Sequence, residues 1–484
     1  MIPQRDGRVT TKVDSRIRPR DRACGTDVSA LMEKGTSSRI RALFSELRQL
    51  ADARGCGLYV VGGWPRDLLL NRPNWDIDLV VEGDGVAFAK AFASQMGGRV
   101  VSHARFRTAT MVLPDGFKMD PASARQEHYE HPGALPEVRV SCIAEDLSRR
   151  DFTINSMAIG LSSGRYGTLL DPFGGRRDLK RKRLRVLHEG SFVEDPTRMM
   201  RAVRFEQRYG FRMEPETERL LRQAAGDRML ERVSSQRIRE EVILLLREDE
   251  PAKPWARLDA LGLLDALHPG LAMDPDRMAL FARIEEVLSW FGQRHPDDEV
   301  DRWMLFFLGA VDGLSSQERA AFAARWNMPS KVRDLVTASE RFDEVAHVLA
   351  QVRIPPNRIY RLLVPLSMEA LLFLMARTTD LPVKEGIVLY LDRLRKLSLE
   401  ISGTDLVDSG IPRGPIFRTI LERVLEAKRD GRVHTRAEEW ACACQIRRAI
   451  EKPEMEGSAG TGCGPATRDE DHPGKEGDLP NGIA

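Results

Sequence analysis

The chain has 484 residues, of which 42% are hydrophobic and 30% are charged, so it is long enough for roughly two to four domains and has a globular composition. No stretch approaches the roughly 18 apolar residues of a membrane helix, and the first residues lack the apolar segment of a signal peptide. We therefore expect no membrane contact and a cytoplasmic location. The six cysteines form no Cys-x-x-Cys pair and no cluster with histidines, which argues against a zinc site or a disulfide framework.

Both ends of the chain differ in composition from its middle. Residues 1–36 are rich in Arg, Asp and Gly and show no apolar periodicity, which predicts a flexible basic arm. Residues 453–484 are rich in Gly and Pro and carry mainly acidic charges, which predicts a disordered acidic tail. Between these ends the pattern changes near residue 165. Residues 37–165 mix helical and β-rich runs, and almost everything beyond them is helical, so we expect an α+β protein with an N-terminal α/β module.

Individual elements follow from periodicity. Short runs rich in β-forming residues predict strands over residues 58–61, 77–81, 110–113 and 117–120. Apolar residues three and four apart predict helical structure over residues 237–247, 277–291, 302–308, 358–376 and 383–399.

The first motif along the chain is a pair of glycines, Gly62 and Gly63, which follows a predicted strand and precedes a helix that starts near Pro65. Glycine lets backbone N–H groups approach a phosphate closely, and the start of a helix favours an anion. The motif therefore predicts contact with the triphosphate of a nucleotide. A tight turn without a ligand is the alternative, because the same pattern is found in many unrelated folds.

Two aspartates one residue apart, Asp76 and Asp78, come next. Residues i and i+2 of a strand point to the same face, so both carboxylates can meet the same cations. Mg²⁺ prefers oxygen ligands, and two ions about 3.5–4 Å apart stabilise the attacking and leaving oxygens of a phosphoryl displacement. Asp120 is the candidate third carboxylate and would help to activate the attacking hydroxyl. A solvated turn for the pair, and a cap for Asp120, are the alternatives.

The segment Arg149-Arg150-Asp151 and the nearby Asn155 form the third motif. Arginines and a carboxylate supply charge-assisted hydrogen bonds to phosphate and ribose, and Asn155 would cap or orient the segment. A surface arginine pair over a buried apolar stripe is the alternative.

The fourth motif has the pattern of a helix start, with Asp195 as the N-cap and Pro196 at the first position. Arginines spaced three or four apart would then share one face of the helix. Like charges on one face repel each other unless an anion is near, so this face predicts contact with phosphate, with a solvated face as the alternative. The arginines concerned are Arg198, Arg201, Arg204 and Arg208.

A basic run precedes that helix. Residues 176–185 contain seven basic residues and one acidic residue, a composition that suits the phosphate backbone of a nucleic acid. We take Arg181, Lys182 and Arg183 as the candidate RNA contacts.

Taken together and in this order, these motifs resemble the class II tRNA nucleotidyltransferase and bacterial poly(A) polymerase family. The resemblance covers about residues 37–450, and the series of motifs is highly specific although each one is modest. It implies a nucleotidyltransferase head (37–165), then a helical neck (166–255), a helical body (256–400) and a helical tRNA-binding tail (401–452), whose opening segment 402–415 also looks like the family's. The motifs are Gly62-Gly63-x-x-Arg66-Asp67, Asp76-x-Asp78, Arg149-Arg150-Asp151-Phe152-Thr153-Ile154-Asn155 and Glu194-Asp195-x-x-Arg198-x-x-Arg201.

The resemblance implies a role for each motif. Asp76 and Asp78 would hold the catalytic Mg²⁺, with Asp120 as the third catalytic carboxylate. Asp195 and Arg198 would recognise the Watson–Crick edge of the incoming base, so that the protein itself serves as the template. The remaining nucleotide contacts would be Gly62, Gly63 and Arg66 on the triphosphate, Arg150, Asp151 and Asn155 on ribose and phosphates, and Arg201 and Arg204 on the same face as Arg198.

The sequence departs from the family pattern at two places. Trp64 and Pro65 replace the small apolar pair that is usual after the glycines, and Arg107 stands where the family commonly has glycine. Glycine supplies backbone freedom that arginine lacks, so Arg107 leaves the behaviour of the following flexible loop open.

The implied function is Mg²⁺-dependent addition of nucleotides to the 3′ end of tRNA, with release of pyrophosphate and with tRNA, ATP and, for CCA addition, CTP as partners. The product is either CCA or the terminal A only, and residues 132–136 and 359–366 look more like A-adding relatives. A bacterial poly(A) polymerase is one alternative, although processive polyadenylation would benefit from a basic extension in place of the acidic end. An inactive RNA-binding homologue is the other, and the presence of all three carboxylates argues against it.

Overall fold

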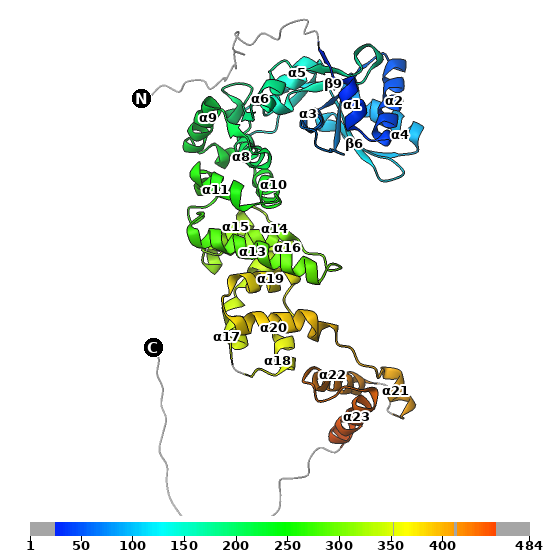
Figure 1. Cartoon of the computed structure of the whole chain (residues 1–484), viewed down its shortest axis with the longest axis vertical. Helices are drawn as coiled ribbons and strands as arrows, with labels where there is room; N and C mark the ends of the chain where they lie inside the picture. The colour runs from blue at the N-terminus through cyan, green and yellow to red at the C-terminus, as the bar shows by residue number, and fades with distance from the viewer. Residues whose placement is uncertain (1–24, 352, 411–413, 452–484) are drawn as a thin grey trace, which may run out of the picture. The chain divides into compact units, whose positions relative to one another are not determined.

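The computed structural model describes residues 25–351, 353–410 and 414–451, and Figure 1 shows their elements. These residues form two compact units. The first unit comprises residues 25–351 with 363–387, and the second comprises residues 353–362 with the described residues from 388 onward. Residues 1–24 of the predicted basic arm and the predicted disordered tail, 453–484, lie outside the described residues.

An eight-stranded sheet forms the start of the first unit, in the order β1-β10-β9-β2-β3-β6-β5-β4. Strand β3 lies near its centre and pairs antiparallel with β2 and parallel with β6. The four predicted strands are confirmed, each within three residues at either end. The strands are β1 (Thr26–Asp27), β2 (Gly57–Val61), β3 (Ile77–Glu82), β4 (Arg99–His103), β5 (Thr108–Val112), β6 (Lys118–Ser123), β9 (Ala158–Gly160) and β10 (Thr168–Leu170).

Helices accompany this sheet. Helix α4 packs against β4, β5 and β6, and the carboxylate of Asp84 caps it by accepting hydrogen bonds from two backbone N–H groups. Leu79, Val80 and Val81 of β3 are almost completely buried, as expected of a strand covered on both faces. The helices of this region are α1 (Ser29–Gly35), α2 (Ser38–Ala53), α3 (Gly63–Leu69), α4 (Gly85–Met96) and α5 (Ile143–Ser148).

Two predicted limits of this region are wrong. The predicted flexible arm, 1–36, is ordered from residue 25: β1 pairs with β10, and Val28 and Met32 are buried. These two apolar residues, four apart, anchor one short helix, too little for periodicity to reveal. The sheet also continues to Leu170, beyond the predicted limit of 165, because β10 pairs with both β9 and β1.

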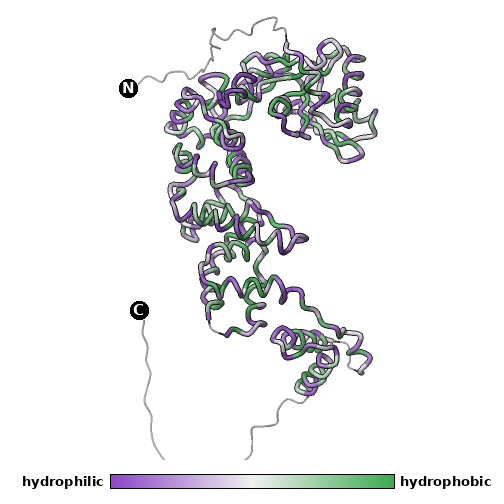
Figure 2. The backbone as a smooth tube through the Cα atoms, in the orientation of Figure 1, coloured by the Kyte–Doolittle hydropathy of each residue, from purple (hydrophilic) through white to green (hydrophobic). Residues whose placement is uncertain are grey.

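The rest of the first unit is mainly helical. Helix α8 packs against α10 and α11, and α13 packs against α14 and α19. In Figure 2 the helices carry both hydrophobic and hydrophilic residues, as the predicted periodicity requires. Its helices are α6 (Gly175–Lys180), α7 (Ser191–Glu194), α8 (Thr197–Tyr209), α9 (Pro215–Gly226), α10 (Ser235–Leu246), α11 (Ala252–Ala260), α12 (Leu263–Leu267), α13 (Pro275–Arg294), α14 (Arg302–Val311), α15 (Ser316–Arg325), α16 (Ser330–Ser339), α17 (Phe342–Leu349) and α19 (Met368–Arg377).

Two further pairs of short strands lie outside the eight-stranded sheet. Two small two-stranded sheets pair β7 (Arg125–His128) with β8 (Glu137–Val140) and β11 (Arg183–Leu184) with β12 (Arg212–Met213). The pair β11–β12 lies within the neck that we predicted to be all-helical. Strands of two residues are too short for the period of two to be visible in the sequence.

The predicted helical stretch 358–376 is divided into α18 (Pro356–Leu363) and α19. Pro365 lies in the break, where its ring and missing N–H oppose a continuous helix, and Ser367 starts α19 by accepting a hydrogen bond from the backbone N–H of Ala370. The other predicted helices are confirmed as α10, α13, α14 and α20 (Leu381–Asp392), although α20 ends before 399.

The second unit is larger than the predicted tail, 401–452, because residues 353–362 and 388–400 belong to it. Tyr360 explains this, since its ring lies 5.8 Å from that of Tyr390, and the guanidinium carbon of Arg429 lies 3.3 Å from the Tyr360 centroid. These contacts join three segments that are distant in sequence. The helices that lie wholly within it are α21 (Gly403–Asp408), α22 (Pro415–Arg429) and α23 (Arg436–Glu451).

Within the described residues, no single helix is both long and apolar enough to cross a membrane.

Candidate active site

The three predicted carboxylates come together at one edge of the sheet. Asp78 of β3 and Asp120 of β6 are register partners in the parallel pair, and Asp76 immediately precedes β3. Each of the three offers a carboxylate oxygen within 4.8 Å of those of the other two. Asp76 and Asp78 thus lie together, as their i, i+2 spacing predicted, and the register of β6 adds Asp120.

The electrostatics of this cluster suit a cation. Burial and the charge of Asp76 raise the pKa of Asp78 to about 6, and burial with the charge of Asp120 raises the pKa of Asp76. Carboxylates in such a position repel each other, and a bound cation would relieve that repulsion. The donor set consists of hard oxygen atoms only, so the residues present fit a divalent metal ion.

The glycine turn lies beside these carboxylates. Gly62 has a positive φ of 69° with ψ of −122°, which residues with a side chain rarely adopt, and α3 begins at Gly63. A Cβ atom placed on Gly62 would lie 3.2 Å from Asp78 Oδ2 and 3.1 Å from Arg150 Nη1. Both the backbone conformation and the lack of space therefore require glycine here.

A cavity of about 510 Å³ extends from the carboxylates toward α8 and α10. Its lining joins the glycine turn, the segment after α5 and the first turns of α8. Most of the predicted site residues therefore face one space, whereas Asp120 borders a neighbouring hollow, and Arg181, Lys182 and Arg183 line neither. The predicted residues that line the cavity are Gly62, Gly63, Arg66, Asp76, Asp78, Arg150, Asp151, Asn155, Asp195, Arg198, Arg201 and Arg204.

Asn155 links two of the predicted motifs. Its Oδ1 accepts a hydrogen bond of 2.6 Å from Arg66 Nη1, and its Nδ2 donates one of 3.0 Å to Asp151 Oδ1. Arg66 also donates two hydrogen bonds of 2.9 Å to Asp67. Asn155 thus orients its neighbours, as the sequence indicated, and Arg66 is held by protein groups at the cavity wall.

Three of the four arginines on the face of α8 form ion pairs with acidic residues of the protein. Arg201 pairs with Asp151 at 2.7 Å, and both Arg201 and Arg204 contact Glu241 of α10. Arg208 binds Glu248 through Nε at 2.9 Å. Acidic residues about 40 positions further along the chain therefore neutralise most of these arginines.

Arg198 differs from its three neighbours on α8. It is buried, and its guanidinium donates to neutral oxygens, at 2.8 Å to Ser191 Oγ and at 2.7 Å to the backbone carbonyl of Arg149. No carboxylate forms an ion pair with it among the described residues. Its positive charge is thus positioned at the cavity wall and left available to a ligand.

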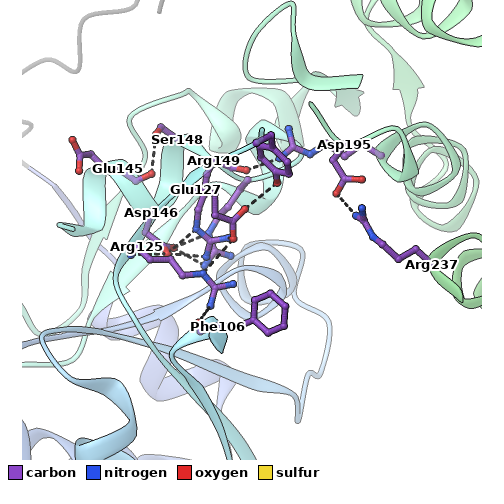
Figure 3. A network of polar contacts seen from close by, with 12 residues as sticks. Phe106, Arg125, Glu127, Glu145, Asp146, Ser148, Arg149, Asp195 and Arg237 are labelled. Atoms are coloured by element: carbon purple, nitrogen blue, oxygen red, sulfur yellow. Dashed lines mark hydrogen bonds and ion pairs between the residues drawn. The ribbon is translucent and has the colours of Figure 1, made fainter. Parts of the chain in front are cut away.

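Asp195 lies one residue further from the helix than predicted, because α8 begins at Thr197. Its Oδ1 still accepts hydrogen bonds from the Thr197 backbone N–H at 3.1 Å and from the Thr197 hydroxyl at 2.6 Å. Its Oδ2 accepts from Arg237 Nη2 of α10 at 2.6 Å, and Figure 3 shows the two side chains facing each other.

Comparison with known proteins identifies the family. Residues 58–185 match the Poly A polymerase head domain, and residues 210–274 match the probable RNA and SrmB-binding site of polymerase A. An A-adding tRNA nucleotidyltransferase of Halalkalibacterium halodurans is 35% identical over 392 residues, which cover 78% of this chain and 86% of that protein. The chain belongs to the class II tRNA nucleotidyltransferase family.

Further relatives agree with this membership. An A-adding tRNA nucleotidyltransferase of Geobacter sulfurreducens is 40% identical over 426 residues, 87% of this chain, but the chain spans only 48% of that protein. The Thermotoga maritima CCA-adding enzyme, solved in complex with tRNA, matches with a TM-score of 0.68 and 33% identity, covering 88% of this chain and 99% of that one. The predicted fold class, a head with a sheet and a mostly helical remainder, is confirmed. In this nucleotidyltransferase family, the acidic triad points to use of a divalent metal.

A polar network behind the cavity was missed by sequence reasoning. Glu127 accepts from Arg149 at 2.7 Å, from Arg125 at 3.2 Å and from the Tyr129 hydroxyl at 3.0 Å. Asp146, fully buried, pairs with Arg149 and Arg150, and these charges keep its pKa low despite its burial. Figure 3 shows Arg125, Glu127, Asp146 and Arg149 converging.

The lining residues that sequence reasoning missed had little signal in the sequence. Arg149, which the third motif includes, also lines the cavity. Glu127, Arg237 and Glu241 belong to no motif that we could place, and strand pairing or helix packing brings them to the site.

The two departures from the family pattern are accommodated in different ways. Trp64 is buried, and its ring packs edge-on against Phe44 at 5.3 Å, so the larger pair fills the core under α2. Arg107 adopts a left-handed backbone with φ of 51°, at the end of a short 3-10 turn before β5. Glycine would adopt this conformation without strain, which accounts for the family's usual residue.

The candidate RNA contacts Arg181, Lys182 and Arg183 are exposed at the turn after α6 and in β11. Lys182 has a left-handed φ of 52°, which marks the tip of this turn. Arg183 is the register partner of Arg212 in β12, which is also exposed, so the basic surface extends across both strands.

Proposed function

We propose that this protein is a tRNA 3′-end nucleotidyltransferase whose product is the terminal A. The observation that carries the proposal is the carboxylate triad at the mouth of a cavity lined by arginines, in a chain whose relatives from two organisms are A-adding tRNA nucleotidyltransferases. The partners are tRNA, as in the solved Thermotoga complex, and ATP, with CTP only if the full CCA is added.

In the proposed reaction the 3′ oxygen of the RNA forms a bond to the α-phosphorus of the nucleotide. The bond from that phosphorus to the bridging oxygen of the β-phosphate breaks, and pyrophosphate leaves with the bonding electrons. Asp120 is the carboxylate placed to accept the proton of the attacking hydroxyl. Release of that proton to solvent completes the balance.

Asp76 and Asp78 would hold Mg²⁺, the ion that we propose for this site. A bound Mg²⁺ supplies neutralisation of the charge that develops on the phosphate oxygens. The lack of a side chain at Gly62 lets Arg150 and Asp78 lie close to the turn, where Arg150 would donate to phosphate oxygens.

Recognition of the base falls to Asp195 and Arg198 in this proposal. Arg198 offers an unpaired positive charge, and Asp195 is an acceptor fixed by Thr197 and Arg237. An acceptor and a donor on one wall are complementary to the adjacent amino group and ring nitrogen of adenine.

Incorporation tests this function. Transcripts of one tRNA that end before CCA, after C and after CC are each incubated with ATP or CTP, and products are sized to one nucleotide. We expect one added nucleotide on the transcript ending in CC with ATP, and none with CTP. Incorporation of CMP would contradict the A-only version and favour CCA addition.

A poly(A) polymerase is the second candidate, because the head matches the family of that name. A long product ladder on a generic RNA with ATP would establish it. If the double variant Asp76→Ala with Asp78→Ala loses incorporation and retains tRNA binding, the protein is not an inactive homologue. Retained incorporation in that variant would contradict the metal assignment.

A further inference from the structure

The hydrogen bonds proposed for Asp195 and Arg198 do not by themselves separate ATP from CTP. Adenine and cytosine each carry an amino group beside an unprotonated ring nitrogen, so one acceptor and one donor are complementary to both bases. A product limited to the terminal A therefore requires a second feature of the cavity. The two bases differ in the area of their flat faces, because a purine has two fused rings and a pyrimidine has one.

Aromatic side chains are the natural partners of a flat base. Among the described residues that line the cavity, two are aromatic, Tyr129 and Phe205. Phe205 is buried, the guanidinium carbons of Arg201 and Arg204 lie 5.3 and 4.9 Å from its ring centroid, and the ring of Tyr209 stacks against it at 6.1 Å. Side chains of the protein thus already pack around Phe205, whereas Tyr129 is half-buried at the cavity wall.

The turn that carries Tyr129 is attached beside the base-recognising pair. Tyr129 directly follows β7, and the turn continues to the start of β8. Within this turn, the backbone N–H of Gly133 donates a hydrogen bond of 3.3 Å to the carbonyl oxygen of Glu194, the residue before Asp195. The turn and Asp195 are therefore connected through the backbone.

The hydroxyl group of Tyr129 is held by the protein. It donates a hydrogen bond of 3.0 Å to Glu127 Oε2, and Glu127 Oε1 accepts one of 2.7 Å from Arg149 Nη1. Burial, followed by the charge of Glu127, raises the pKa of Tyr129, and the charges of Arg198 and Asp195 also act on it. The phenol is therefore neutral near pH 7 and lies within electrostatic reach of both base-recognising residues.

We propose that the ring of Tyr129 stacks on the base of the incoming nucleotide and favours adenine over cytosine. The larger base covers more of the ring, so stacking stabilises bound ATP more than bound CTP. Tyr129 is then a specificity-determining residue, while Asp195 and Arg198 orient the base. The assignment rests on the proposed function, because it takes the cavity as the nucleotide site.

Two substitutions at Tyr129 separate the ring from its hydroxyl group. Tyr129→Leu removes the ring, and Tyr129→Phe keeps it. Calorimetric titration of the full chain with ATP or CTP, with Mg²⁺ and without RNA, measures Kd. We expect Tyr129→Leu to raise the Kd for ATP by about tenfold and that for CTP by less than about threefold, and Tyr129→Phe to stay within about twofold of wild type. Equal changes for the two nucleotides, or no change, would overturn the proposal.

Tyr166→Leu is the matched control. Tyr166 is also half-buried, lines neither the cavity nor the neighbouring hollow, and has the guanidinium carbon of Arg48 5.1 Å from its ring centroid. We expect its Kd for ATP to match wild type. A loss of ATP affinity as large as that of Tyr129→Leu would attribute both effects to the fold and contradict the proposal.

Photolabelling tests the contact in the wild-type chain, where no variant has to fold. The protein is irradiated with 8-azido-ATP and digested with trypsin, which releases residues 126–139 as one peptide between Arg125 and Arg139. Labelling of this peptide that excess ATP prevents supports the proposal, and labelling confined to other peptides overturns it.

The same measurements distinguish this proposal from the proposed function. A wild-type chain that is labelled on residues 126–139 but adds no nucleotide to any tRNA transcript retains the base contact and refutes the proposed activity. A chain that adds the terminal A with an ATP affinity independent of Tyr129 refutes the role of the ring alone.

Discussion

Arg201 Nη2 lies 2.7 Å from Asp151 Oδ2, and this buried ion pair ties the segment after α5 to helix α8. Arg201, with help from Asn155, lowers the pKa of Asp151 to about 2 although burial opposes the shift. Arg201 also contacts Glu241 of α10, so the pair belongs to a network that joins the two cavity walls.

The Asp151–Arg201 pair predicts acid sensitivity. A carboxylate with a lowered pKa adds stability that is present above its unfolded value near 3.8 and is lost as pH falls through about 2. Asp151→Asn should therefore cost roughly 2 kcal/mol at pH 7, and the difference from wild type should shrink between pH 4 and pH 2. Thermal unfolding across that range checks it, with the exposed Asp227→Asn as control. A difference independent of pH would contradict the ionic explanation.

The turn at Gly62 offers a matched pair of substitutions. Gly62→Ala and Gly55→Ala both force alanine into a backbone of positive φ, at 69° and 61°. Only at Gly62 would the new Cβ approach other atoms, Arg150 Nη1 and Asp78 Oδ2. Each variant should lose about 1 kcal/mol of stability or more, but only Gly62→Ala should also lose incorporation by about tenfold or more. Equal activity of the two would show that the space beside Gly62 is not used by the substrate.

Some parts of the site could be predicted from the sequence, and others could not. The periodicity of strands placed Asp76 and Asp78 together, and the order of motifs indicated the glycine turn beside them. The anions that neutralise Arg201 and Arg208 could not be predicted, because Glu241 and Glu248 reach them only through the packing of α8 against α10. Helix packing is a property of the folded chain, and a single sequence does not reveal it.

The pKa of Asp78 is raised to about 6, which indicates that its ionised carboxylate destabilises the metal-free folded protein. A carboxylate with a raised folded-state pKa adds stability only below its unfolded value near 3.8, and that stability is lost as pH rises through about 6. Asp78→Asn should therefore stabilise the metal-free protein at pH 8 by roughly 1–3 kcal/mol and leave it unchanged near pH 4. Thermal unfolding in a chelator measures this. Millimolar Mg²⁺ should make wild type more stable than Asp78→Asn at pH 8. If the variant remains the more stable protein, the metal assignment is contradicted.

The basic turn at Arg181, Lys182 and Arg183 predicts a salt effect. If these side chains contact RNA phosphates, replacing all three by alanine should weaken tRNA binding and reduce the slope of log affinity against log salt by about 2–3. Binding titrations at several salt concentrations provide the measurement, and ATP affinity should not change. Arg219→Ala is the control, because Arg219 is exposed but already paired with Glu216. An unchanged slope would remove this segment from the RNA-binding surface.

Arg237 predicts a change in base selectivity without a change in chemistry. Its Nη2 donates to Asp195 Oδ2, and its Nη1 is buried with no hydrogen-bond partner among the described residues. Arg237→Ala should leave Asp195 held by Thr197 alone, raising the KM for ATP by about tenfold and narrowing the preference for ATP over CTP. Arg239→Ala is the matched control on the same helix, since Arg239 donates to the backbone carbonyl of Asn327 and lines neither hollow. Competition between the two nucleotides on a tRNA ending in CC measures the preference. Arg237 touches no carboxylate of the triad. A uniform loss of rate with an unaltered preference for ATP over CTP would therefore show that Arg237 supports the fold and does not take part in base recognition.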